Sequence, residues 1–152
     1  MWLQTYSSHE GLREPMPTEY RNNVYMGLVN HVSGYMNWLG CPENGDLWDE
    51  MGRAYGTALR WLEMTVQPGA KRLAKGKIGN IAYALWERGN GGHALVAANT
   101  SYSPQKETLS LGAELGKSSE LIGGEGNLSI GNSGMLAVSL PVAGSAAWFI
   151  GE

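Results

Sequence analysis

The first 66 residues alternate between short apolar runs and longer stretches in which apolar residues recur at helical spacing. Apolar runs at 2–6 and 33–38 predict two strands, and the intervals of three and four residues predict helices over 20–32 and 46–66. Strand, helix, strand, helix is the repeat of a parallel sheet. Two such units cannot cover both faces of a sheet, so the pattern indicates part of a larger α/β fold.

Signals at the helix ends sharpen these predictions. For the first helix, Pro17 suits the first turn and Thr18 suits an N-cap, but Arg21 then stands where Glu or Gln would complete a capping box. Asp46 is the expected N-cap of the second helix, which Pro68 ends. The expected buried stripe of the first helix is Tyr20, Val24, Leu28 and Val32. The expected apolar face of the second is Trp48, Met51, Tyr55, Leu59 and Leu62.

Beyond residue 67 the pattern changes to short β-prone runs separated by Gly, Ser and Asn. The predicted strands are 81–86, 93–99, 108–111, 120–122, 127–130, 135–140 and 146–150. Asn90-Gly91 suits a hairpin turn because both residues tolerate positive φ, and Gly123–Gly126 is interpreted as another turn. About seven short strands of this kind predict a small antiparallel β-sandwich. At strand spacing, Trp86 and Trp148 are expected in its core rather than on a binding face.

The fold class is therefore α/β plus all-β, with an α/β unit at 1–68 and a sandwich at 76–152. The densest basic cluster is interpreted as a solvated linker between them; its members are Lys71, Arg72, Lys75 and Lys77. The formal net charge of −3 and the lack of a Lys/Arg block argue against a nucleic-acid or anionic-membrane partner. No apolar run approaches the roughly 18 residues of a membrane span.

The sequence leaves the cellular compartment open. Cys41 is the one cysteine, so an internal disulfide is excluded. No signal-peptide pattern follows Met1, although Met1 is either a true start or an internal methionine. A secreted or periplasmic parent protein is compatible with both observations.

Three consecutive segments carry a resemblance to a known family: Pro17-Thr18-Glu19-Tyr20-Arg21, Val24–Val29, and Ser33-Gly34-Tyr35-Met36-Asn37-Trp38. Together they resemble the C-terminal strands of (β/α)8-barrel glycoside hydrolases. The helix from residue 47 to 66 looks like the final barrel helix. The segment Ala94–Thr100 is similar to the apolar strand and following Asn of the β-sandwich appended to many such enzymes.

The resemblance implies a partial (β/α)8 barrel, its final two strand–helix units, followed by the sandwich. It implies a parent enzyme that hydrolyses a glycosidic bond in a carbohydrate substrate by carboxylate acid/base catalysis. In many retaining members the acid/base carboxylate follows strand four, so the upstream barrel segment is expected to be missing here and the isolated chain inactive. One departure is Asn30-His31-Val32, where related families often have Gly-Ala.

The candidate site residues follow from this resemblance, because barrel enzymes gather their sites at the C-terminal ends of the strands. Trp38 is a candidate sugar-stacking residue or a core residue of its strand, and Asn37 can hydrogen-bond sugar hydroxyls. Gln4 and Tyr6 either face the pocket or fill the barrel. Glu10 follows the strand that carries the nucleophile in many retaining members, and is either that carboxylate or a solvated loop residue.

Other chemistries lack the required spacing. The three histidines are scattered, with no HxH, HExxH or CxxC motif, so neither a metal nor another cofactor is expected. No GxSxG elbow marks a catalytic serine. Two alternatives to the hydrolase remain: a non-catalytic carbohydrate-binding or protein-interaction module, and a self-contained α+β protein of unrelated function.

Overall fold

The computed structural model describes residues 1–4, 13–38, 42, 44–111 and 115–151, with Trp2, Gln4 and Trp38 described by their backbone. The helices are α1 (Pro17–Val29), α2 (Gly45–Thr65) and the short 3-10 turn η1 (Asn132–Gly134). The strands are β1 (Trp2–Gln4), β2 (Met36–Trp38), β3 (Lys71–Ile78), β4 (Ile81–Glu87), β5 (His93–Asn99), β6 (Gln105–Ser110), β7 (Ser118–Gly124), β8 (Asn127–Ile130), β9 (Met135–Leu140) and β10 (Ser145–Gly151).

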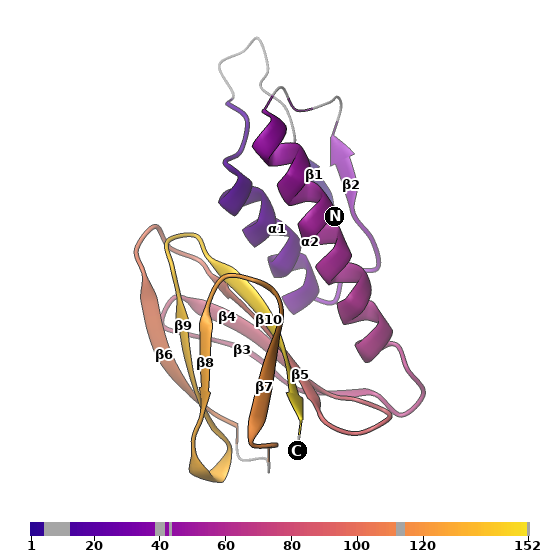
Figure 1. Cartoon of the computed structure of the whole chain (residues 1–152), viewed down its shortest axis with the longest axis vertical. Coiled ribbons are helices and arrows are strands. Elements are labelled where there is room, and N and C mark those ends of the chain that lie inside the picture. The colour runs from indigo at the N-terminus through magenta and orange to yellow at the C-terminus, as the bar shows by residue number, and fades with distance from the viewer. Residues whose placement is uncertain (5–12, 39–41, 43, 112–114, 152) are drawn as a thin grey trace.

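The N-terminal part contains the two strand–helix units that the sequence predicts. β1 and β2 pair in parallel, with Leu3 opposite Asn37 and Gln4 opposite Trp38. The helices α1 and α2 lie side by side (Figure 1). Leu3 is buried in the core that the helices share, whereas Met36 is 55% exposed. One face of this strand pair is therefore packed and the other is open over the described residues.

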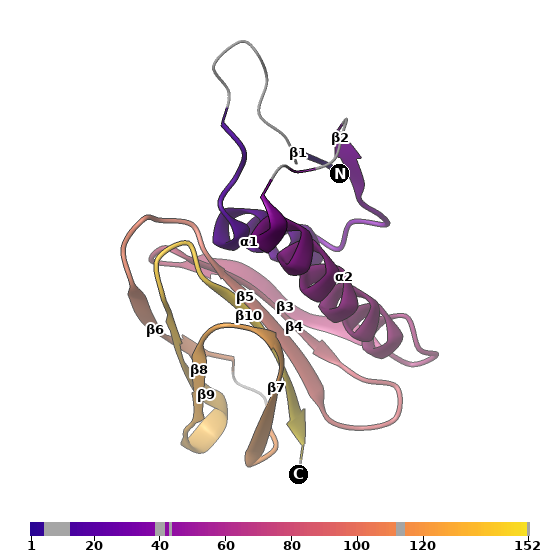
Figure 2. The same cartoon turned by 45° about the horizontal axis from the view of Figure 1, so that its top comes forward.

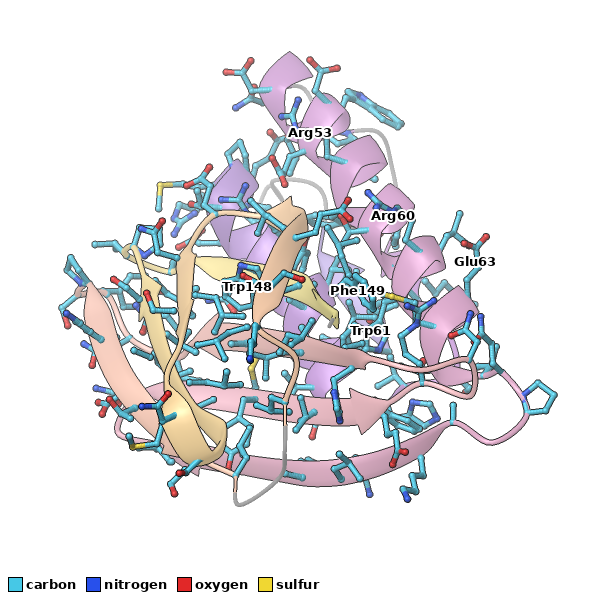
Figure 3. All side chains as sticks on the ribbon, turned by 60° about the horizontal axis from the view of Figure 1, so that its bottom comes forward. Arg53, Arg60, Trp61, Glu63, Trp148 and Phe149 are labelled. Atoms are coloured by element: carbon cyan, nitrogen blue, oxygen red, sulfur yellow. The ribbon has the colours of Figure 1, made fainter. Side chains whose placement is uncertain are left out.

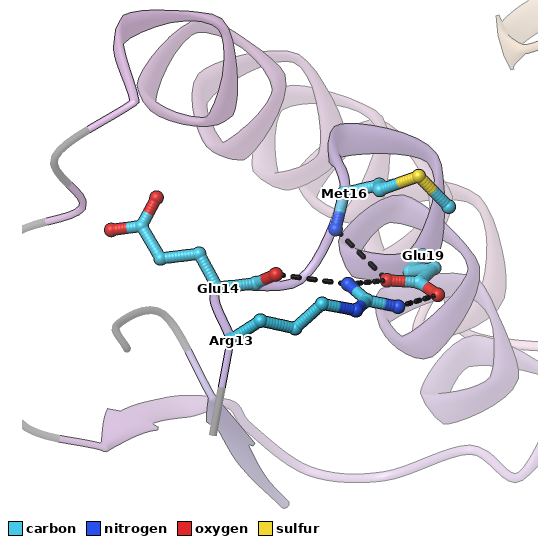
Figure 4. A network of polar contacts seen from close by, with 4 residues as sticks. All are labelled: Arg13, Glu14, Met16 and Glu19. Atoms are coloured by element: carbon cyan, nitrogen blue, oxygen red, sulfur yellow. Dashed lines mark hydrogen bonds and ion pairs between the residues drawn. The ribbon is translucent and has the colours of Figure 1, made fainter. Parts of the chain in front are cut away.

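The start of α1 corrects the capping prediction. The helix begins at Pro17 with Met16 as the N-cap, so the third helical position is Glu19 and not Arg21. The Glu19 carboxylate accepts a hydrogen bond of 2.9 Å from the Met16 backbone N–H, and the Arg13 guanidinium donates to both of its oxygens (Figure 4). An acidic side chain in the first turn also complements the helix dipole. The prediction that a capping box is absent is therefore wrong: the acidic residue that completes it is Glu19, two residues before Arg21.

The segment that departs from the related families closes α1. The His31 N–H donates to the Leu28 carbonyl and the Val32 N–H to the Gly27 carbonyl, which is the Schellman pattern. His31 takes the positive φ of 54° that this motif requires and that glycine usually supplies. The imidazole ring lies 4.7 Å from the Trp86 ring, so the contact with the sheet offsets part of the backbone cost.

The N-cap and the buried face of α2 both differ from the prediction. Asn44, and not Asp46, is the N-cap: its side chain accepts the Asp46 N–H at 2.9 Å. Trp48 and Leu59 from the predicted face are 47% and 64% exposed. The buried stripe is Leu47, Met51, Ala54, Ala58, Trp61 and Thr65. A shift of one residue along the helix rotates the buried stripe by about 100°. A search for large apolar residues misses the alanines, whose small side chains allow the helix to approach its neighbours closely.

The C-terminal half forms antiparallel sheets, as predicted. One sheet has the order β3-β4-β5-β10-β7 and the other has the order β6-β9-β8. The predicted linker is wrong, because Lys71 to Ile78 form strand β3, which pairs along its length with β4 at the sheet edge. Its lysines are typical of an exposed edge strand, where charge discourages pairing with other chains. The sheet thus begins before residue 76, and the independence of two folding units stays a prediction.

The five-stranded sheet carries different residues on its two faces. Facing the smaller sheet are large side chains that share a core with Leu109, Leu136 and Val138. Facing the helices are mainly small ones: Ala82, Ala84, Ala94, Val96, Ala98 and Ala147. Figure 2 shows the helices across one face and β6, β8 and β9 on the other side. Small side chains on a sheet let helices approach closely, so this alternation sets which face takes the helices.

Neighbouring aromatic residues of β10 mark the two layers. Trp148 is 2% exposed and belongs to the core between the sheets, whereas Phe149 packs on the helix side (Figure 3). Trp86 is also buried, at 7%, in the layer below the helices together with Trp61. The prediction that Trp86 and Trp148 are core residues is confirmed, so neither offers a stacking face.

A buried ion-pair network ties α1 to α2 and to the sheet. Arg21 is 6% exposed and its guanidinium lies 3.5 Å from Glu50, which is 5% exposed, and 3.0 Å from Glu125 after β7. Arg53 approaches the other Glu50 oxygen at 3.2 Å from the exposed side of α2. Because buried charges require partners, Arg21 fixes the position of both helices relative to the turn after β7.

Replacing Arg21 by Met is expected to lower the free energy of unfolding by about 3 kcal/mol, since Glu50 would stay buried with Arg53 alone. The matched control is Arg53→Met, which removes the exposed partner of the same carboxylate and is expected to cost less than about 1 kcal/mol. Urea unfolding followed by circular dichroism measures both. Equal losses in the two variants would contradict the assigned role of Arg21.

Candidate functional site

The candidate site lies where β1 and β2 end. Strand residues alternate between faces, so the positions opposite each other in a parallel pair share a face. Leu3 and Asn37 occupy the face toward the helices, and the backbone register puts positions 4 and 38 on the face that Met36 occupies. In this register, positions 4 and 38 lie opposite each other at the ends of the two strands.

Asn37, near the end of β2, is bound to the helices. Its Oδ1 is 2.8 Å from the Tyr20 hydroxyl and 2.8 Å from the Tyr55 hydroxyl, and these hydroxyls are 2.8 Å apart. The two phenols carry two protons, so two of the three contacts can be hydrogen bonds at any moment. These contacts fix the end of β2 on α1 and α2, and the role of Asn37 as a contact for sugar hydroxyls stays a prediction.

Tyr35 completes the aromatic layer beneath the strands. Its hydroxyl donates to the Val24 carbonyl at 2.7 Å, and its ring lies 6.0 Å from the ring of Tyr55. Tyr55 in turn meets the edge of Tyr20 at 6.3 Å. Burial raises the pKa of Tyr20 and of Tyr35, because a phenolate would lose its hydration there. Tyr20 and Tyr35 are therefore neutral parts of the scaffold near neutral pH.

Two of the predicted site residues, Tyr6 and Glu10, lie outside the described residues. Trp38 and Gln4 are placed by their backbone at the ends of their strands. Their roles as substrate contacts, and that of Glu10 as a carboxylate of the reaction, stay predictions. The sequence did not predict the layer formed by Tyr20, Tyr35 and Tyr55. Within its own segment each tyrosine looks like an ordinary apolar residue, and the three come from different parts of the chain.

Other classes of site find no support in the described part of the chain. No group of three or more His, Cys, Asp or Glu side chains lies close enough together there to hold a metal ion. Neither helix combines the length with the apolar character that a membrane crossing needs, over the residues that the structure describes.

Solved structures that share this fold include glycoside hydrolases. The chain aligns over 99% of its length with the catalytic domain of GH30 xylanase C from Talaromyces cellulolyticus, at 16% identity and a TM-score of 0.58. It aligns over 99% with a GH30 endoxylanase from Clostridium papyrosolvens at 17% identity and a TM-score of 0.58. It aligns over 96% with α-galactosidase I from Mortierella vinacea at 12% identity and a TM-score of 0.58.

The chain covers 40%, 41% and 38% of those three proteins, respectively. No protein-family model matches the sequence, and no curated protein matches it. Sequence identities of this size establish a shared fold and nothing about activity. The chain therefore has a glycoside hydrolase-related fold and spans about two fifths of each of these three hydrolases.

Gly27 is expected to be essential for the tyrosine layer. A Cβ at this position would lie 2.6 Å from the ring and from the hydroxyl of Tyr35. Gly27→Ala is expected to lower the free energy of unfolding by about 2 kcal/mol, because Tyr35 must leave its place. Gly52 in α2 is the matched control, since a Cβ there meets nothing within 4 Å. Gly52→Ala should raise stability by up to about 1 kcal/mol in the same urea experiment; a gain in both variants would contradict the close packing.

Alkaline pH is expected to destabilise the fold through its buried phenols. Burial raises the pKa of Tyr25 to about 12, with a smaller opposing effect from the Thr57 hydroxyl. The unfolded chain releases this proton near pH 10, so stability is fully present below about pH 10 and falls as the pH rises to about 12. Urea unfolding across this range measures the loss. Tyr25→Phe should make the decline shallower, and an unchanged slope would refute the assignment.

Proposed function

We propose that this chain is the C-terminal portion of a (β/α)8-barrel glycoside hydrolase. In this proposal β1–α1 and β2–α2 are the last two barrel units, and the antiparallel sheets form an appended β-sandwich. The observation that carries it is the parallel pair β1–β2 with its helices on one face, in a chain that spans about two fifths of structurally similar hydrolases.

Exposed apolar side chains support the part-of-a-barrel interpretation. Met36 on the open strand face is 55% exposed, and Trp48, Leu59 and Val66 along or just after α2 are 47%, 64% and 65% exposed. An apolar groove of about 310 Å³ runs past Leu59 along the side of α2. In a closed barrel the strand face lies against the other strands, and the last helix packs against its neighbour. Surfaces of this kind usually mark contacts with other segments.

The proposed reaction is hydrolysis of a glycosidic bond with two carboxylates. Glu10, at the end of the strand that often carries the nucleophile in the resembling families, is the candidate within this chain. The acid/base carboxylate belongs to barrel strands outside it. Trp38 would stack on a sugar ring, and Gln4 and Tyr6 would contact its hydroxyls. The structural neighbours are named as xylanases and an α-galactosidase, so xylans and galactosides are the first substrates to try.

The purified chain is expected to show no turnover of aryl xylosides or aryl galactosides, because a single carboxylate cannot supply both the acid and the nucleophile. A longer form encoded at the same locus, carrying further barrel strands, is expected to hydrolyse one of them. In that form Trp38→Ala should lower kcat/KM by at least about tenfold. Trp48→Ala, an aromatic truncation on the outer side of α2, is the control.

Turnover by the chain alone would overturn the proposal. So would a longer form whose added sequence contains no barrel strands, and so would an active longer form in which Glu10→Gln and Trp38→Ala leave kcat/KM unchanged. Each of these results would favour one of the alternatives, a non-catalytic module or an unrelated α+β protein.

A further inference from the structure

A groove of about 620 Å³ opens between the start of α1 and the loop that joins β5 to β6. Its size lies within the range of small-molecule sites. It stands apart from the tyrosine layer at the ends of β1 and β2. The lining residues used below are Arg13, Glu19, Asn22, Asn23, Ser101 and Tyr102.

Tyr102 presents an aromatic ring to solvent at this groove. The residue is 77% exposed, which is unusual for a large side chain with an apolar ring. The Tyr102 hydroxyl is near enough to Glu19 to lower the pKa of that carboxyl slightly, after the larger effects of the Arg13 guanidinium and the Met16 N–H. The exposed faces of the ring are accessible to a ligand.

The loop that carries Tyr102 is fixed by a buried side chain. Asn99, at the end of β5, is 0% exposed and donates from Nδ2 to the Ser103 and Pro141 carbonyls at 2.7 and 2.8 Å. Its Oδ1 accepts from the N–H and the hydroxyl of Ser101 at 2.9 Å each. All polar atoms of the amide are used within the loop, so the ring is presented by an ordered support and binding incurs little ordering entropy.

Two neighbouring amides line the groove and have different roles. The Asn22 Nδ2 donates to the Asn99 carbonyl at 2.6 Å, which fixes the orientation of the amide and ties α1 to the end of β5. Its Oδ1 is buried and has no hydrogen-bond partner among the described residues. Asn22 therefore supports the wall of the groove. The exposed amide of Asn23 adds donors and an acceptor at the rim.

The charge balance of the groove selects the class of ligand. Among the described residues, the charged ones that line it are Arg13 and Glu19, and they pair with each other at 2.6 Å. The remaining polar groups are amides and hydroxyls beside one aromatic ring. A ligand that matches these groups is uncharged, rich in hydroxyls, and has an apolar face for stacking, which is the description of a neutral sugar ring.

We propose that this groove binds a neutral oligosaccharide, with one sugar ring stacked on Tyr102 and its hydroxyls bonded to Asn23. The lining residues used here all belong to the described part of the chain, and the proposal does not depend on the hydrolase activity proposed above. Since a helix in a strand–helix unit starts at the end where the strand finishes, the groove lies at the same end of the molecule as Gln4 and Trp38. A long glycan can therefore contact both places.

The test uses the full chain, titrated with xylohexaose and separately with a galacto-oligosaccharide, while backbone amide shifts are followed by NMR. Shifts are expected at Asn22, Asn23 and the loop from residue 100 to 103. Tyr102→Ala should weaken binding by at least about tenfold, whereas Tyr102→Phe keeps the ring and should stay within about twofold. Trp48→Ala removes an exposed aromatic ring outside the groove and should leave binding unchanged.

Binding that survives Tyr102→Ala would overturn the assignment, as would the lack of groove shifts with both saccharides. Circular dichroism of each variant separates a lost contact from a lost fold. The hydrolysis experiment on the longer form tests a different part of the molecule, so a failure of the groove and a failure of the proposed hydrolase are distinguishable.

Discussion

The packing of two helices on one face of the five-stranded sheet is the constraint from which the rest of the structure follows. Mostly alanine side chains face the helices from β4, β5 and β10. On the facing side of α2, Ala54, Ala58 and Trp61 pack against them. Small side chains on both surfaces bring the backbones close, and the tryptophan fills the space that remains. This layer holds α1 and α2 in place, and they in turn hold the short strands β1 and β2.

Polar groups within and beside this layer convert a hydrophobic contact into a defined geometry. Arg21 is buried between α1, α2 and the turn after β7, and its two carboxylate partners leave it few alternative positions. Asn37 restricts the position of β2 in a similar way, because its Oδ1 is a hydrogen-bond acceptor for the hydroxyls of Tyr20 and Tyr55. Apolar packing alone would allow the helices to slide over the sheet. A buried charge or amide requires its hydrogen-bond partners, so these residues fix the position of the strand ends.

Two kinds of exposed surface remain, and they have different chemical meanings. The open strand face and the outer side of α2 carry exposed apolar side chains, Met36, Trp48 and Leu59, as expected of a surface that another protein segment covers. The groove beside Tyr102 combines a stacking ring with amides and a neutralised ion pair, as expected of a surface that meets a sugar. The proposed hydrolase, completed by further barrel strands, would account for the first surface, and the proposed glycan contact would account for the second.

The sequence by itself determined the order of elements, because periodicity and turn residues are local properties. Strands β4, β5, β8 and β9, both helices, and the buried state of Trp86 and Trp148 were accessible in this way. The tertiary structure decided which side of α2 is buried, because both the side rich in large apolar residues and the side rich in alanines could pack against the sheet. It also decided that Lys71 to Ile78 form an edge strand, because pairing with β4 outweighs a charged, linker-like composition. Asn37 and Tyr102 acquired their roles in the same way: the partners of each lie far away along the chain, where no local pattern records them.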